Sequence, residues 1–121
     1  MTKSKWKLLI IDQMKSLDIQ YEPYNSVIET LSGILEQRDK TFKEFKESGG
    51  KSVISYTNKG GATNMTKNPL LTLWDDLNKS ALSYWRDLGL TPSSYKKMAG
   101  DINKNDKPTK LEAALMSIET S

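Results

Sequence analysis

The sequence predicts a mainly helical fold interrupted by one short β-hairpin, on three observations. Three of the four prolines follow a polar or turn-favouring residue, at Glu22-Pro23, Asn68-Pro69 and Thr91-Pro92. These pairs are typical of helix starts, because proline at the first helical position loses no hydrogen bond. Between them, apolar residues recur with helical spacing. One segment instead has β-branched and aromatic residues before a glycine pair, which indicates a hairpin.

The composition is that of a single ordinary domain. The chain has 121 residues, of which 36% are hydrophobic and 27% charged, enough for one modest core. It contains no cysteine and no histidine, which removes disulfides, zinc sites and most hydrolytic triads. The longest apolar run, Leu8 to Ile11, is too short for a bilayer and lacks a signal-peptide cleavage pattern. We therefore expect a soluble, unexported chain that uses no metal and no cofactor.

The basic residues are unevenly distributed. The net charge of +3 is mild, but lysines dominate two segments. One precedes Asp12 and contains Lys3, Lys5 and Lys7, and the other contains Lys51, Lys59 and Lys67. If the chain binds nucleic acid, we expect these segments to supply the contacts, through Lys3, Lys5, Lys7, Lys59 and Lys67.

A first helix is predicted from about Thr2 to Ile19. Its apolar stripe consists of Trp6, Leu9, Ile10 and Leu17. Leu8 and Ile11 point well away from this stripe, so the helix needs packing partners on two sides.

A second, long helix is predicted from about Pro23 to Ser48, which would span roughly 35 to 40 Å. Its narrow apolar face consists of Tyr24, Val27, Ile28, Leu31, Ile34, Leu35, Phe42 and Phe45. Arg38 lies in the middle of this face, where an unpaired charge would be costly. It must find an acceptor or reach a surface, either by packing its stem on the core or by contacting a neighbouring subunit or phosphate.

A third helix is predicted from about Pro69 to Leu88, with Asn68 as its N-cap. One side consists of Leu70, Leu73, Trp74, Leu77, Ala81, Tyr84, Trp85 and Leu88. Leu71 and Leu82 widen the apolar arc to roughly half of the circumference, more than one core contact uses. Gly89 suits the left-handed C-cap position, and Thr91-Pro92 then starts a helix of one to two turns, so a tight helix-turn-helix is expected.

The chain after Gly100 is expected to be separate from this helical domain, which spans residues 1–100. The sequence GDINKNDKP is polar and has no helical spacing of apolar residues, which predicts a flexible linker. Thr109 and Glu112 then have capping-box spacing, and a short helix follows within the 101–121 segment. Its apolar face consists of Leu111, Leu115 and Ile118, and it either packs back on its own domain or docks on a partner.

The segment ISYTNKGGATNMTKNP, from Ile54 to Pro69, raises the choice between a phosphate-binding loop and a turn. A P-loop needs a lysine directly after its last glycine and a helix immediately afterwards, whereas here Lys59 precedes the glycines. The flanking segments favour strands, and NKGG supplies residues that accept positive φ. We therefore predict a hairpin near residues 52–66. Because an isolated ribbon is marginal in water, it should lean on the helices or on another subunit.

The run from Lys67 to Met98, with the hairpin and the long helix before it, resembles the small subunit of phage terminases. An asparagine-proline helix start, a helix and an LGLTP turn follow a glycine-containing hairpin in that order. The resemblance covers about Tyr24 to Asp101, and the matching residues are Asn68, Pro69, Leu70, Leu88, Gly89, Leu90, Thr91, Pro92 and Ser93.

The resemblance implies a non-enzymatic packaging factor of the host cytoplasm. Such proteins assemble into rings, recognise double-stranded viral DNA and deliver it to the large terminase subunit, which carries the ATPase and the nuclease. The residues agree with this, because the surplus apolar faces predict a homo-oligomer larger than a dimer. The expected interface residues are Leu8, Ile11, Leu71, Trp74 and Leu82, and the expected docking residues for the large subunit are Leu111, Leu115 and Ile118.

Three alternatives remain open at this level. A helix-turn-helix regulator, which a dimer would favour, would read DNA with the short helix expected between Pro92 and Gly100, which lacks the arginine, asparagine and glutamine side chains suited to base edges. An enzyme could use Asp75 and Asp76 with a metal ion, although adjacent helical residues project about 100° apart. A head-assembly protein that never touches DNA is the third.

Overall fold

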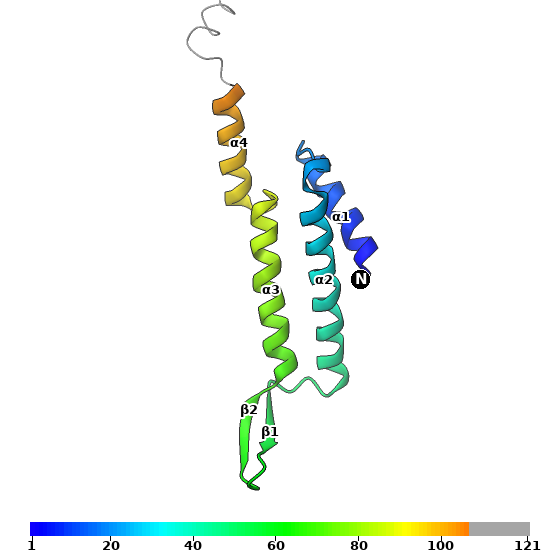
Figure 1. Ribbon diagram of the computed structural model, residues 1–121, viewed down its shortest axis with the longest axis vertical. Helices are drawn as coiled ribbons and strands as arrows, with labels where there is room; N and C mark the ends of the chain where they lie inside the picture. The colour runs from blue at the N-terminus through cyan, green and yellow to red at the C-terminus, as the bar shows by residue number, and fades with distance from the viewer. Residues whose placement is uncertain (107–121) are drawn as a thin grey trace, which may run out of the picture.

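The computed structural model describes residues 1–106, with residues 101–106 described by their backbone alone. Its elements in chain order are α1 (Lys3–Ser16), the 3-10 turn η1 (Glu22–Tyr24), α2 (Asn25–Glu47), β1 (Val53–Thr57), β2 (Thr63–Lys67), α3 (Pro69–Asp87) and α4 (Pro92–Asp106). In Figure 1, α2 lies between α1 and α3, the hairpin projects beyond one end of this body, and α4 projects beyond the other. The predicted mainly helical fold with a long helix and a hairpin is confirmed. Within the described residues, no helix has the length and apolar character needed to cross a bilayer.

The core lies along both sides of α2. Its buried residues are Ile10 and Met14 from α1, Ile19, Ile28, Leu31 and Leu35 from α2 and the turn before it, and Ala81 and Leu88 from α3 and its end. Each fully buried aliphatic side chain of this size stabilises the fold by about 1.5–3 kcal/mol relative to an exposed one. The narrow apolar face predicted for the long helix is therefore the structural centre of the domain.

The prediction of which α1 residues face the core is wrong for Leu9 and Ile11. Leu9, expected on the stripe, is 40% exposed, whereas Ile11, expected to point away, packs against the core. Both residues lie about 100° from the fully buried Ile10, on opposite sides, so helical periodicity alone does not distinguish them. The position of α1 on α2 decides which flank is covered.

The end of α3 confirms the predicted glycine cap. Gly89 has φ of 74°, its amide donates to the Arg86 carbonyl at 3.0 Å, and the Leu90 amide donates to the Trp85 carbonyl at 2.9 Å. These are the two bonds of a Schellman motif. Glycine is favoured here by its backbone conformation, and a Cβ at residue 89 would lie 2.3 Å from the Met98 sulfur, so the Met98 side chain would have to move.

The segment after Thr91 differs from the prediction in length and direction. α4 runs from Pro92 to Asp106, so Gly100 lies inside a helix and does not start a linker. The polar residues after it carry no apolar periodicity, and one glycine costs a helix only about 1 kcal/mol, so neither feature ends it. Tyr95 and Met98 of the first turns of α4 pack against the core. In Figure 1, α4 then continues beyond the end of α3 and does not cross back as in a helix-turn-helix. The predicted docking residues Leu111, Leu115 and Ile118 lie outside the described residues.

Candidate nucleic-acid interface

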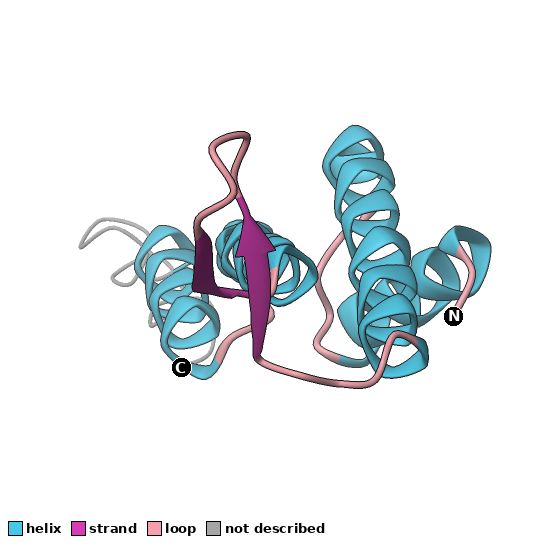
Figure 2. Cartoon of the chain, turned by 90° about the horizontal axis from the view of Figure 1, so that it is seen from below, coloured by secondary structure: helices cyan, strands magenta, loops and turns pink. Residues whose placement is uncertain are grey.

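The hairpin is the most exposed element of the domain. β1 and β2 pair antiparallel from Val53 opposite Lys67 to Thr57 opposite Thr63. Every strand residue is exposed except Ile54, which is half-buried. Figure 2, seen from below, places the two strands over the end of α3 and separate from α1. The predicted hairpin is confirmed, and within the described residues its sheet has only these two strands.

Asn58 closes the tip of the hairpin. Its side-chain oxygen accepts from the amides of Gly60 at 2.9 Å and Ala62 at 3.0 Å, and its own amide donates to the Ala62 carbonyl at 2.9 Å. Gly61 has φ of 83°, a conformation that costs glycine little. The tip is therefore a compact turn, which leaves the Lys59 side chain exposed.

Asn68 anchors the base of the hairpin. Its amide donates to the Ser52 carbonyl at 2.8 Å, and its side-chain nitrogen donates to the Lys51 carbonyl at 3.0 Å. Its side-chain oxygen accepts from the Leu70 amide at 3.0 Å and so caps α3, as predicted. One buried asparagine joins both ends of the ribbon to the first turn of a helix. This anchoring offsets the marginal stability expected of two strands alone.

The segment containing the hairpin has basic residues and no acidic ones. Between Glu47 and Asp75 the chain has Lys51, Lys59 and Lys67 and no acidic residue. Lys67 forms an ion pair with Asp75, with Nζ 2.7 Å from the carboxylate oxygen. Among the side chains of residues 1–100, Lys51 and Lys59 form no ion pair. The projecting arm thus carries two positive charges that no carboxylate in the described part of the chain offsets.

The lysines of α1 have a different environment. Lys3 and Lys7 both reach Glu29 on α2, at 2.8 and 3.0 Å. Their hydrogen bonds, Lys3 first, hold the pKa of Glu29 below its ordinary range. Lys5 forms no ion pair in the described region. In Figure 1 the N-terminus lies beside the middle of α2, so the structure does not bring the five predicted lysines together into one surface.

Arg38 finds its acceptors inside the protein. Its guanidinium pairs with Asp39 at 3.1 Å, donates to the side-chain oxygen of Asn78 on α3 at 3.4 Å, and lies over the ring of Trp6 at 5.3 Å. The Trp6 indole donates to the same Asp39 carboxylate at 2.7 Å. The sequence predicted that Arg38 needs a partner. It did not indicate that the Asp39 carboxylate and the Trp6 indole would be its partners.

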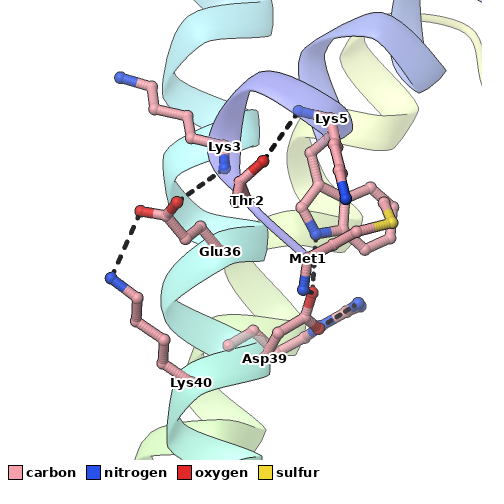
Figure 3. A network of polar contacts seen from close by, with 9 residues as sticks. Met1, Thr2, Lys3, Lys5, Glu36, Asp39 and Lys40 are labelled. Atoms are coloured by element: carbon pink, nitrogen blue, oxygen red, sulfur yellow. Dashed lines mark hydrogen bonds and ion pairs between the residues drawn. The ribbon is translucent and has the colours of Figure 1, made fainter.

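Polar contacts of Glu36 and Asp39 hold the first turn of α1 against α2, as Figure 3 shows. The Lys3 backbone amide donates to Glu36 at 2.7 Å, and the Met1 ammonium lies 3.3 Å from Asp39. The Lys3 bond is the main cause that lowers the pKa of Glu36. Partial burial raises the pKa of Asp39, but the hydrogen bonds from Trp6 and Arg38 and the ammonium outweigh it and lower the net value.

The predicted interface residues divide into two groups. Leu8 is 69% exposed and Leu82 is 42% exposed, so both are accessible to another chain. Ile11 packs against the core, Leu71 is half-buried, and Trp74 stacks on Phe42 with ring centroids 5.2 Å apart. The second group therefore has partners within its own chain.

One member of the acidic pair considered for a metal is engaged elsewhere. Asp75 pairs with Lys67 across the junction of β2 and α3. Among the side chains of residues 1–100, no three acidic groups lie close enough to hold a metal ion. Nothing in the arrangement of Asp75 and Asp76 builds a catalytic site.

Comparison with known proteins gives one match. The model of a family described as phage terminase, small subunit, matches residues 2–105. No curated protein matches the chain significantly, and no solved structure does. The family match covers all of the elements described above.

Replacement of Asp39 by asparagine should destabilise the domain by about 1–3 kcal/mol, because Arg38 loses its carboxylate and stays half-buried. The pKa of Asp39 in the folded protein lies below its ordinary value of 3.8. The stabilisation of the fold by the Asp39 carboxylate is therefore fully present above pH 3.8 and is lost as the pH falls through the folded-state pKa. Urea unfolding curves at neutral and acid pH measure both effects, and the variant should lose less stability on acidification.

The matched control for this experiment is Lys40→Ala. Lys40 pairs with Glu36 at 3.7 Å on the surface, and its removal should change stability by less than about 0.5 kcal/mol. Equal urea midpoints for wild type and Asp39→Asn at neutral pH would contradict the role assigned to Asp39.

Proposed function

The chain belongs to the phage terminase small-subunit family, and from this premise we propose that it binds double-stranded viral DNA and delivers it to the large terminase subunit. The family places the chain in phage genome packaging. Within that role we assign the ATPase and nuclease steps to the large subunit, and we place the assembly in the host cytoplasm. The small subunit then acts by binding alone.

The observation that carries the proposal is the projecting hairpin, with no acidic residue between Glu47 and Asp75. DNA presents regularly spaced phosphates, and each lysine that neutralises one releases counterions and so favours binding. Lys51 and Lys59 are available for this without breaking an ion pair among the side chains of residues 1–100, whereas Lys3, Lys7 and Lys67 must first leave Glu29 or Asp75. Lys5 and Lys59 are therefore the strongest of the five predicted contacts, and we add Lys51 to them.

Self-association strengthens this binding. Leu8 and Leu82 are exposed on α1 and α3, the two helices that flank α2. We propose that they, with Ile11, Leu71 and Trp74 at their margins, contact neighbouring copies in a ring larger than a dimer. A ring repeats the hairpin around its circumference, and the repeated weak contacts then act together on one DNA molecule.

The contact with the large subunit is assigned to the segment beyond the described residues. The spacing of Leu111, Leu115 and Ile118 in the sequence is that expected of an amphipathic helix that docks in a groove. The buried core of the described residues lies before Gly100.

Replacing Lys51 and Lys59 together with alanine should weaken DNA binding and reduce its salt dependence. Each lost phosphate contact lowers the slope of log affinity against log salt by about 0.9. The matched control is the pair Lys3→Ala and Lys7→Ala, whose charges already face Glu29. Fluorescence anisotropy on a labelled duplex across a salt series gives both slopes. If the two double variants lose affinity equally, the hairpin is not the preferred contact.

Wild-type protein should have a mass larger than that of a dimer in light scattering at micromolar concentration. Leu71→Ser combined with Leu82→Ser should give smaller species, because α3 loses one exposed and one half-buried apolar side chain that we assign to the interface. Ser83→Ala, exposed on the same helix, is the control and should leave the mass unchanged. A uniform wild-type monomer would rule out the assembly.

A chain that ends at Asp106 should fold and assemble normally but fail to stimulate the ATPase of the large subunit. The measurements are circular dichroism, light scattering and ATP hydrolysis by the large subunit with each form of the small subunit. The triple change of Leu111, Leu115 and Ile118 to serine in the full chain should reproduce the loss. Full stimulation by the shortened chain would place the docking surface elsewhere.

A further inference from the structure

The hairpin carries more hydrogen-bonding side chains than phosphate contact requires. Besides its lysines, its strands and turn present hydroxyl, amide and phenol groups, from Ser55, Tyr56, Thr57, Thr63, Asn64 and Thr66, all of them exposed. Phosphate contacts position a protein on DNA, whereas side-chain amides and hydroxyls can also distinguish base edges. The composition of the ribbon is therefore suited to sequence recognition.

The strand register divides these groups between two faces. Residues directly opposite each other share a face, so Tyr56 with Asn64 and Ile54 with Thr66 form one face. On the other face Thr57 and Thr63 are hydrogen-bonded to each other at 3.1 Å, and Lys67 is paired with Asp75. No hydrogen bond within residues 1–106 uses the side chain of Asn64 or Tyr56. The unengaged polar groups of the strands are thus concentrated beside the Tyr56–Asn64 pair.

The dimensions of the ribbon suit one groove of DNA. Two strands lie about 4.8 Å apart, and five residues extend about 17 Å. The major groove of B-DNA is about 12 Å wide and admits a two-stranded ribbon, whereas the minor groove is about 6 Å wide. Lys51 lies before β1 and Lys59 lies in the turn, so the two unpaired cations stand at opposite ends of the ribbon, where phosphates border the groove.

We propose that the hairpin lies in the major groove of duplex DNA with its Tyr56–Asn64 face toward the base edges. The Asn64 amide binds one adenine by accepting from its N6 amino group and donating to its N7, the pairing that an asparagine side chain fits best. Thr66 and Tyr56 contact the neighbouring base edges, and Lys51 and Lys59 bind phosphates on either side. This assignment rests on the proposed function and adds to it the element and the residue that read sequence.

The proposal distinguishes duplex DNA from duplex RNA. A-form RNA has a deep, narrow major groove that side chains do not read. A hairpin that inserted only its lysines between phosphates would bind both duplexes, because both carry the same backbone charge. A hairpin that reads the major groove prefers DNA.

The experiment is a selection of binding sites from a random duplex DNA library with the full chain, repeated with Asn64→Ala. Wild type should enrich a short motif containing adenine, and the variant should lose the preference at that base by about tenfold or more. Ser55→Ala, on the opposite face, is the matched control and should enrich the wild-type motif. Light scattering of each variant shows whether assembly is unchanged.

A chemical substitution in the DNA tests the same bond without changing the protein. In the selected site, 7-deazaadenine removes the N7 acceptor and leaves the minor-groove edge intact. Wild type should bind this duplex about tenfold more weakly than the adenine duplex, and Asn64→Ala should bind the two equally.

Different results overturn different parts of the inference. If wild type binds duplex DNA but enriches no motif, or if Asn64→Ala enriches the same motif, the hairpin contacts phosphate alone; the proposal fails and the proposed function stands. If Asn64→Ala changes the oligomer mass and not the DNA preference, the face is a contact between copies. If wild type binds no duplex at any salt concentration, the proposed function fails as well.

Discussion

The pairing of Arg38 with Asp39 is the constraint on which the arrangement of the helices depends. Arg38 lies on the apolar face of α2, where an unpaired guanidinium would be costly. The structure meets this requirement with groups from three helices: Asp39 of α2 accepts, Asn78 of α3 accepts, and Trp6 of α1 provides both a ring face and a donor to Asp39. Satisfying one half-buried charge thereby joins α1 and α3 to the two sides of α2, in addition to their apolar contacts. It also determines which side chains, Leu8 and Leu82 among them, are left facing outward.

The position of the hairpin follows from the helices that flank it. α2 and α3 run in opposite directions side by side, so the chain must turn between Ser48 and Asn68, and the hairpin is inserted in that connection. α2 ends in a Schellman motif, with the Gly50 amide donating to the Phe45 carbonyl at 2.9 Å. Asn68 ties the other end of the ribbon to the first turn of α3. The arm therefore projects from a fixed stem, and all of its strand residues except Ile54 are exposed.

The parts of the fold that depend on local chemistry could be predicted from the sequence. The cap at Asn68, the left-handed glycine at Gly89 and the hairpin turn are determined by neighbouring residues, and all three are confirmed. The choice between Leu9 and Ile11 on α1 depends on where a second helix lies, which periodicity does not show. The continuation of α4 past Gly100 was missed because a polar, solvated helix has no apolar stripe. The pairing of Lys3 and Lys7 with Glu29 also needs the packing of α1 on α2, so charge in the sequence did not reveal which lysines are free.

The distribution of charge separates two tasks that would otherwise conflict. Copies that associate through apolar helix faces are driven apart by like charge, whereas binding to DNA requires positive charge. The helical body, residues 1–47 and 69–100, has nearly equal numbers of basic and acidic residues, twelve and eleven. Some of them pair directly, as with Lys3 and Lys7 at Glu29 and Lys40 at Glu36. The arm between these two parts has three lysines and no acidic residue. A net charge of only +3 is therefore sufficient, because the excess of basic over acidic residues is concentrated on the element that projects from the body.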